Sequence, residues 1–161
     1  MKIDVINKSI NDLPTYAKLG DAGMDIRADF SNGIKEDFMF GAAYDEMRET
    51  ILVFSGGRCL VPTGIYTSFP AGYEVQIRPR SGLALKQGIT VLNSPGTIDA
   101  GYRNEWGIII QNLGDEVFEI KQGDRIAQAV LTKVEIVDWN VVETLDDSHR
   151  GQSGYGDSGI K

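Results

Sequence analysis

The chain has 161 residues, a length that suits one domain built on a single hydrophobic core. Its 23 acidic side chains outnumber its 16 basic ones, and the net charge of −7 argues against a protein that binds nucleic acid by neutralising the phosphate backbone. Hydrophobic residues make up 42% of the chain, so most of it is expected to fold.

The sequence also predicts a cytoplasmic protein that has no contact with a membrane. No apolar run approaches the roughly 18 to 20 residues that span a bilayer, and the first residues lack the apolar stretch of a signal peptide. Cys59 is the only cysteine, which excludes an intrachain disulfide and a cysteine-based zinc cluster. We predict a core position for Cys59 rather than a nucleophilic pair with His149, which is expected in solvent.

Alternation of apolar and polar residues at every second position is typical of half-buried β-strands, and it dominates this chain. In the clearest run, 73–78, Tyr73, Val75 and Ile77 share one face. Similar runs cover residues 2–7, 64–69, 106–112 and 125–137. Turn signals occur at residues 69–72, 112–115 and 121–124. The pattern predicts an all-β fold, namely an antiparallel sandwich, barrel or jelly roll.

Two stretches interrupt the alternation and define the predicted domain organisation. Residues 29–50 form an excursion from the sheet, and their end, 42–49, has a helix-favouring composition. Residues 146–161 hold four glycines and too few apolar residues to pack alone. We therefore expect one β domain over residues 1–145, with 29–50 as an insertion, followed by a flexible glycine-rich arm at 146–161.

Several short motifs carry potential chemistry, although each alone also fits an ordinary turn. The G-x-G-x-x-G spacing at 154–159 lacks the following helix that a dinucleotide-binding motif needs, because only two residues follow it. Pro79-Arg80-Ser81-Gly82 places a guanidinium, a hydroxyl and backbone N–H groups directly after a strand, where they could bind phosphate. Residues 93–102 bring a carboxylate, Asp99, close to an aromatic ring near a hairpin.

The motifs at 79–82 and 93–102 occur in order with three more, at residues 22–26, 123–128 and 150–159. Together the five resemble the motifs of the trimeric deoxyuridine triphosphate nucleotidohydrolases, the dUTPases, over residues 1–28 and 51–161. The resemblance implies a jelly-roll or barrel-like β fold and a homotrimer whose active sites are shared between subunits. It also implies Mg²⁺-assisted hydrolysis of dUTP to dUMP and pyrophosphate. That reaction limits uracil incorporation into DNA and supplies dUMP for dTMP synthesis.

The resemblance assigns the catalytic and metal-binding roles to two carboxylates. Asp99 matches the aspartate that positions and activates the attacking water and meets the sugar 3′-hydroxyl. A carboxylate suits this role because it can accept the proton of the water. Asp25 matches the residue that holds magnesium through the water molecules of the ion, which keeps part of its hydration shell.

The same resemblance assigns the substrate contacts. The phosphates would be bound by Arg80, Ser81, Gly82 and Gln128. Tyr102 would lie beneath the deoxyribose and reject a 2′-hydroxyl, while Asn93 and the backbone near Ile98 would read the uracil edge. The arm would contribute Arg150 to the γ-phosphate, Tyr155 to stack on uracil, and Ser158 to the phosphates.

The last motif departs from the family pattern at three places. Tyr155 stands where phenylalanine is usual, Ser153 replaces a glycine, and Asp157-Ser158 stands where Ser-Thr is common. The Tyr155 ring keeps the stacking face. A carboxylate at Asp157 would be repelled by phosphates unless it faces away from them or toward the metal.

Two other functions are considered. The related deoxycytidine triphosphate deaminases share the fold, but they need a catalytic glutamate on the strand after the hairpin, and residues 107–112 contain none. A non-catalytic or regulatory trimer could instead use residues 29–50 to contact another protein.

Overall fold

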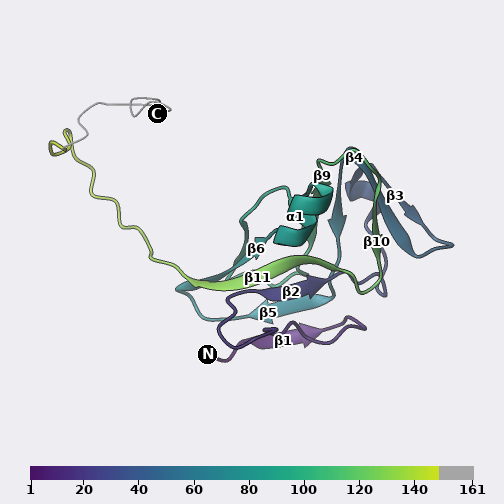
Figure 1. The fold of residues 1–161 in the computed structure, drawn as a ribbon. Coiled ribbons are helices and arrows are strands. Elements are labelled where there is room, and N and C mark those ends of the chain that lie inside the picture. The colour runs from purple at the N-terminus through teal and green to yellow at the C-terminus, as the bar shows by residue number, and fades with distance from the viewer. Residues whose placement is uncertain (149–161) are drawn as a thin grey trace.

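The structure, a computed structural model, describes residues 1–148 of the chain (Figure 1). Its elements, in chain order, are β1 (Asp4–Asn7), β2 (Met24–Arg27), the short 3₁₀ helix η1 (Glu36–Phe38), β3 (Met39–Asp45), β4 (Thr50–Val61), β5 (Ile65–Ser68), β6 (Tyr73–Arg78), α1 (Ser81–Gln87), β7 (Ile89–Val91), β8 (Gly96–Asp99), β9 (Ile108–Asn112), β10 (Phe118–Lys121) and β11 (Arg125–Lys133). No helix of the described residues 1–148 is long and apolar enough to cross a membrane.

The strands form two larger sheets and one small one, and all of the pairings are antiparallel. One larger sheet has the order β10–β4–β9–β7, with β3 paired to β4, and the other has the order β2–β11–β6–β8. β1 pairs with β5 in the small sheet. The all-β prediction is therefore confirmed. The five alternating runs each contain a strand, although β11 ends at Lys133 rather than near residue 137.

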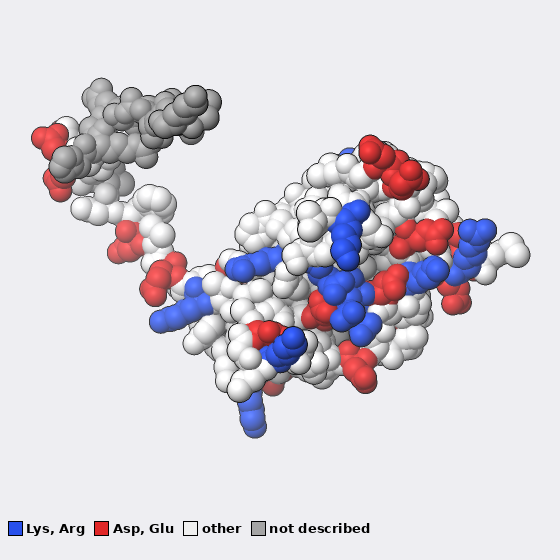
Figure 2. Space-filling view, in the orientation of Figure 1, with Lys and Arg blue, Asp and Glu red and all other residues white. Residues whose placement is uncertain are grey.

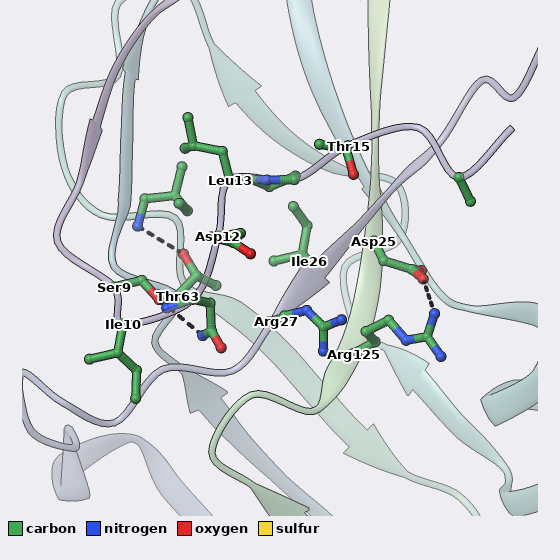
Figure 3. Close-up of a pocket in the computed structure, with 14 residues that line it drawn as sticks. Ser9, Ile10, Asp12, Leu13, Thr15, Asp25, Ile26, Arg27, Thr63 and Arg125 are labelled. Carbon is green, nitrogen blue, oxygen red and sulfur yellow. Dashed lines mark hydrogen bonds and ion pairs between the residues drawn. The ribbon is translucent and has the colours of Figure 1, made fainter. Parts of the chain in front are cut away.

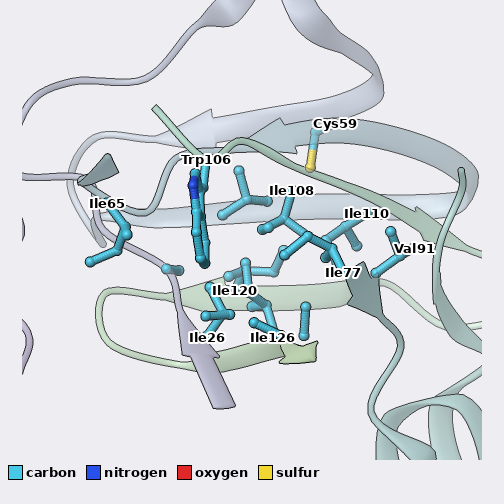
Figure 4. Packing of buried hydrophobic residues seen from close by; sticks show 14 of the residues in the cluster. Ile26, Cys59, Ile65, Ile77, Val91, Trp106, Ile108, Ile110, Ile120 and Ile126 are labelled. Atoms are coloured by element: carbon cyan, nitrogen blue, oxygen red, sulfur yellow. The ribbon is translucent and has the colours of Figure 1, made fainter. Parts of the chain in front are cut away.

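The core lies between the two larger sheets (Figure 4). Alternate residues of β6, Val75 and Ile77, are buried in it. In the same sheet, β11 contributes Ile126 and β2 contributes Ile26. Cys59 on β4 also belongs to this core and is 1% exposed. Burial raises the pKa of its thiol to about 12, so it stays protonated at neutral pH. This confirms Cys59 as a core residue, whereas His149 lies outside the described residues.

The prediction of a helix-favouring segment at 42–49 is wrong. Its first four residues belong to β3, which pairs with β4 from Ala42↔Val53 to Asp45↔Thr50. The Asp45 carboxylate then accepts the backbone N–H of Arg48 at 3.1 Å and shapes the turn. Pairing with a long central strand and packing of Tyr44 edge-on against Phe30 outweigh the helix propensity of the segment.

A second difference concerns the loop expected at 79–82, because helix α1 begins inside it. Pro79 follows the last residue of β6, and Arg80 keeps an extended backbone as the N-cap. The helix ends at Gly88, whose φ of +67° suits a glycine, and its N–H bonds the carbonyl of Ala84 at 3.2 Å. Ser81 and Gly82 therefore occupy the first turn of a helix, where backbone N–H groups lack partners within the helix.

Residues 134–148 contain no helix or strand and lead away from the sheets (Figure 1). The backbone N–H of Val134 still bonds the carbonyl of Gly72, at 3.0 Å. Large apolar side chains beyond it are exposed: Ile136 is 83% exposed, Trp139 84% and Leu145 89%. The boundary expected at residue 145 and the flexible arm at 146–161 stay predictions.

Candidate active site

Asp25 is the centre of a charged cluster that joins three separate motifs. The Nε atom of Arg80 donates to Asp25 Oδ1 at 2.8 Å, and Arg125 Nη1 lies 3.2 Å from Asp25 Oδ2. The guanidinium of Arg80 also donates to the backbone carbonyl of Arg125 at 3.1 Å. One carboxylate thus orients two guanidinium groups, and Lys and Arg side chains gather near the middle of this face beside acidic ones (Figure 2).

The strand that carries Asp25 is fixed at its end by a buried carboxylate, Asp29. Its side chain accepts hydrogen bonds from Ser31 Oγ and Gln122 Nε2, each at 2.7 Å, and from the backbone N–H of Ile10 at 3.4 Å. Burial alone would raise the pKa of Asp29, but these hydrogen bonds outweigh it and lower the pKa below its usual value. The ionised carboxylate therefore ties the end of β2 to the turn that precedes β11.

Asp25 lies between two surface hollows. One, of about 470 Å³, is bounded by residues 9–17 and β2, and the Asp25–Arg125 ion pair lies at its edge (Figure 3). The other, of about 380 Å³, is lined by Asp25, Arg78 and Gln128 among others. A ligand can therefore reach the Asp25 carboxylate from either of the two hollows.

Gln128 is positioned by a close approach of the backbone. Its Nε2 atom donates to the carbonyl of Pro79 at 2.8 Å, which leaves the second N–H of the amide available to a ligand. A Cβ atom on Gly23 would lie 2.5 Å from Oε1 of Gln128. Gly23 thus leaves the space that the amide occupies.

A different part of the fold brings together the residues expected to bind uracil and deoxyribose. Asn93, Ile98 and Tyr102 line a hollow of about 160 Å³ together with Gly96 and Ile108. Tyr102 is 37% exposed, and its phenol donates to the carbonyl of Glu105 at 3.0 Å. Asp99, the last residue of β8, is exposed and directly precedes the loop that carries Tyr102.

The register of the sheet separates Asp25 from Asp99 within one chain. Asp25 pairs with Gln128, Gln128 with Arg78, and Glu74 with Asp99, so both carboxylates project from the outer face of the sheet β2–β11–β6–β8. Crossing from β2 to β8 takes three strand spacings of about 4.8 Å, and Arg78 to Glu74 takes four steps of about 3.3 Å. The two α-carbons are therefore roughly 20 Å apart.

The sequence motifs thus form two groups rather than one. Asp25, Arg80, Ser81, Gly82 and Gln128 make up the first group, whereas Asn93, Ile98, Asp99 and Tyr102 make up the second. Arg150, Tyr155 and Ser158 lie outside the described residues.

Two residues of the site were missed from the sequence, Arg125 and Glu105. Arg125 stands inside the 123–128 motif, which was the signal for it, but its contact with Asp25 spans 100 positions and leaves no local pattern.

The fold and this arrangement define a class: a β-sandwich protein with a cationic cluster for an anion and a separate small hollow beside a carboxylate. The family model of the dUTPases matches residues 42–159, and the chain belongs to that family. The deoxyuridine 5′-triphosphate nucleotidohydrolase of Finegoldia magna is 45% identical over 159 residues, which cover 99% of each chain. The enzyme of the same name from Ehrlichia canis is 44% identical over 99% of this chain and 95% of its own.

Solved structures agree on the fold. A dUTPase of Staphylococcus bacteriophage 80alpha, a mutant with dUpNHpp, superposes with a TM-score of 0.79 at 23% identity over 99% of each chain. The dUTPase from phage phi11 of S. aureus gives 0.72 at 21% identity over 92% of this chain and 100% of its own. The jelly-roll expectation is thereby confirmed. The family match begins at residue 42, so residues 42–50 lie inside the family likeness, although the sequence predicted that all of 29–50 lies outside it.

A glycine-to-alanine change tests the positioning of Gln128. We expect Gly23→Ala to change the free energy of unfolding by no more than about 1 kcal/mol, because the end of a glutamine side chain can move aside. Its kcat/KM for dUTP should nevertheless fall about tenfold, since the displaced amide loses the bond to Pro79. Steady-state kinetics and thermal unfolding measure the two effects.

The control is the same change made in a Gln128→Ala background. There Gly23→Ala should have no further effect on kcat/KM, because the amide it displaces is gone. Independent, additive losses in the double variant would show that Gly23 acts through another contact.

Proposed function

We propose that this chain hydrolyses dUTP to dUMP and pyrophosphate by attack of water on the α-phosphorus. In the cell the reaction would limit uracil incorporation into DNA and supply dUMP for dTMP synthesis. Membership of the dUTPase family and the name shared by the Finegoldia and Ehrlichia relatives support the activity. The observation that carries the chemistry is the convergence of Arg80, Arg125 and Gln128 around Asp25.

The triphosphate would bind at this cluster. Arg80 is held at the start of α1 and can turn its guanidinium from Asp25 to phosphate, because Arg125 remains to pair with the carboxylate. The backbone N–H groups of Ser81 and Gly82 and the free N–H of Gln128 would add uncharged donors. Fixed donors around the developing charge supply most of the catalysis in phosphoryl transfer.

Magnesium fits the donor set at Asp25. The ion usually keeps several waters and binds through one or two carboxylates plus substrate phosphates, so one partly exposed carboxylate suits it. No cluster of three or more His, Cys, Asp or Glu side chains occurs within residues 1–148, which fits an ion held chiefly by substrate. A solved variant of the phi11 phage dUTPase is described with a structural Mg(II) ion. When bound, the ion would neutralise charge on the triphosphate.

The nucleoside would occupy the hollow between β8 and β9. Asn93 and the backbone near Ile98, which line this hollow, would read the edge of uracil, and a closed hairpin around the base would leave no room for the methyl group of thymine. Asp99 would accept the proton of the attacking water and meet the 3′-hydroxyl. Tyr102 would lie beneath the deoxyribose, while Arg150, Tyr155 and Ser158 would close the site from the C-terminal arm.

The distance between the two groups supports the proposal of a homotrimer with shared active sites. A carboxylate that holds the triphosphate metal and one that activates water at the α-phosphorus must act on one substrate, and roughly 20 Å between their α-carbons in one chain is too far for that. Neighbouring subunits would therefore complete each site. The exposed apolar residues of 134–148 support assembly, since their burial between chains would be favourable.

Of the two rival functions, the deaminase finds less support. β9 carries no glutamate for a deaminase, and the nearest one, Glu105, already accepts hydrogen bonds from two backbone N–H groups. β3, on which a protein partner of residues 29–50 would bind, pairs only with β4 among the described strands. That partner stays a prediction.

Replacing the proposed base tests the activity. Asp99→Asn should bind nucleotide yet lose roughly 10²- to 10⁴-fold in kcat, because an amide can hydrogen-bond the sugar but cannot accept the proton of the water. Pyrophosphate release from dUTP, dCTP, dTTP and UTP by the wild type and the variant is the measurement. Asp115→Asn, at an exposed aspartate of the β9–β10 turn, is the matched control and should retain full activity.

Release of ammonia from dCTP, or no nucleotide turnover by the wild type, would contradict the proposed reaction. Near-normal kcat in Asp99→Asn would remove only Asp99 from the mechanism.

Mixing two inactive variants tests the shared site. Asp25→Asn and Asp99→Asn chains, refolded together in equal amounts, should regain about one quarter of wild-type activity, because random assembly pairs intact residues at about a quarter of the sites. Each variant refolded alone should stay inactive. No recovery in mixtures that sediment as mixed trimers would mean that both carboxylates act from one chain.

A further inference from the structure

The loop at 100–105, which connects β8 toward β9, carries Tyr102 and has few contacts of its own. Ala100 packs against the core, but residues 101–104 are exposed, so little apolar packing fixes the part of the loop that carries Tyr102. The backbone N–H of Tyr102 bonds the carbonyl of Asp99 at 3.0 Å, and Arg103 bonds the carbonyls of Ala100 and Tyr102. These bonds shape the loop but join it only to itself.

Glu105 makes the hydrogen bonds that attach the end of this loop to a distant part of the chain. Its Oε1 atom accepts the backbone N–H of Thr63 at 3.0 Å and that of Gly64 at 2.8 Å. In residues 1–148, these are the only hydrogen bonds that lead from 100–105 to a segment distant in the sequence. The carbonyl of the same residue receives the phenol of Tyr102 at 3.0 Å.

The connection at residues 63 and 64 is a firm attachment point. Thr63 is 1% exposed, and its hydroxyl donates to the carbonyl of Trp106 at 2.7 Å. The carbonyl of Gly64 accepts the backbone N–H of Lys8 at 2.8 Å, and a Cβ atom on Gly64 would lie 2.6 Å from the backbone nitrogen of Ser9. Glu105 therefore links a surface loop to a point held from the opposite side by the N-terminal segment.

We propose that Glu105 is a positioning residue that sets the preference for deoxyribose over ribose. The inference rests on the proposed function, in which the ring of Tyr102 excludes a 2′-hydroxyl. Such exclusion works only if the ring cannot retreat, and Tyr102 is 37% exposed with its phenol bonded to Glu105 alone. A carboxylate is suited to hold the loop because a charged acceptor makes stronger hydrogen bonds to two N–H groups than a neutral one.

The test compares kcat/KM for dUTP with that for UTP in variants of Glu105. Glu105→Ala removes the acceptor and should lower the dUTP/UTP selectivity about tenfold, chiefly through faster use of UTP. Glu105→Gln keeps an oxygen acceptor and should retain selectivity within about threefold of the wild type. Amide exchange of 100–105 in the free protein should be faster in Glu105→Ala than in Glu105→Gln.

Thr63→Val is the matched control, because it removes the buried hydroxyl bond to Trp106 and leaves the N–H groups that Glu105 receives. It should lower the melting temperature without changing selectivity. If Glu105→Ala does not fold, Glu105→Asp replaces it, since the shorter carboxylate should not reach both N–H groups and should lose selectivity likewise. Wild-type selectivity in the alanine or aspartate variant, or its loss in Thr63→Val as well, would overturn the proposal. Failure of the wild type to hydrolyse dUTP would instead contradict the proposed function.

Discussion

The hydrogen-bond register of the sheet β2–β11–β6–β8 determines where the two carboxylates of the proposed site, Asp25 and Asp99, lie. Because side chains alternate between the faces of a strand, the partners Asp25, Gln128 and Arg78 all project outward at one level of the sheet. Glu74 and Asp99 project outward at another level, four residues along β6. The inner face is filled by Val75, Ile77 and their neighbours, so a slip of one residue would exchange core for charge.

The ion pairs at Asp25 depend on this register, and they would allow a protein of net charge −7 to bind the triphosphate of the proposed reaction. Two guanidinium groups share one carboxylate, which leaves a local excess of positive charge. Ion pairs on a surface stabilise a fold only slightly, so their value here is orientation. A guanidinium held in place before the ligand arrives loses less conformational entropy on binding than a free one.

Much of the fold could be predicted from the sequence where its pattern is local. The alternation at 73–78 matches β6 residue for residue, because one face of that strand is buried and the other is not. β4 was missed since both of its faces carry apolar residues, and its long run of pairing partners is set by β3, β9 and β10. The end of β3 was mistaken for a helix-favouring segment because the strand that it pairs with, β4, lies outside that segment of the sequence.

In the site, too, residues that belong to local motifs could be predicted, whereas residues that depend on distant contacts could not. The motifs predicted the residues that we propose contact the substrate, since each motif is a short run with its own turn or strand end. Arg125 and Glu105 could not be assigned, because their roles depend on contacts with residues 100 and 42 positions away. The separation of Asp25 from Asp99 likewise follows from strand order and register, which no short motif contains.

In the proposed mechanism, one chain alone cannot form a complete active site. Sedimentation velocity combined with specific activity, measured over a dilution series, is the decisive experiment. Activity per chain should stay constant while the trimer persists and should disappear in parallel with the appearance of monomer. A monomer that hydrolyses dUTP at the kcat of the undiluted protein would rule out a shared active site.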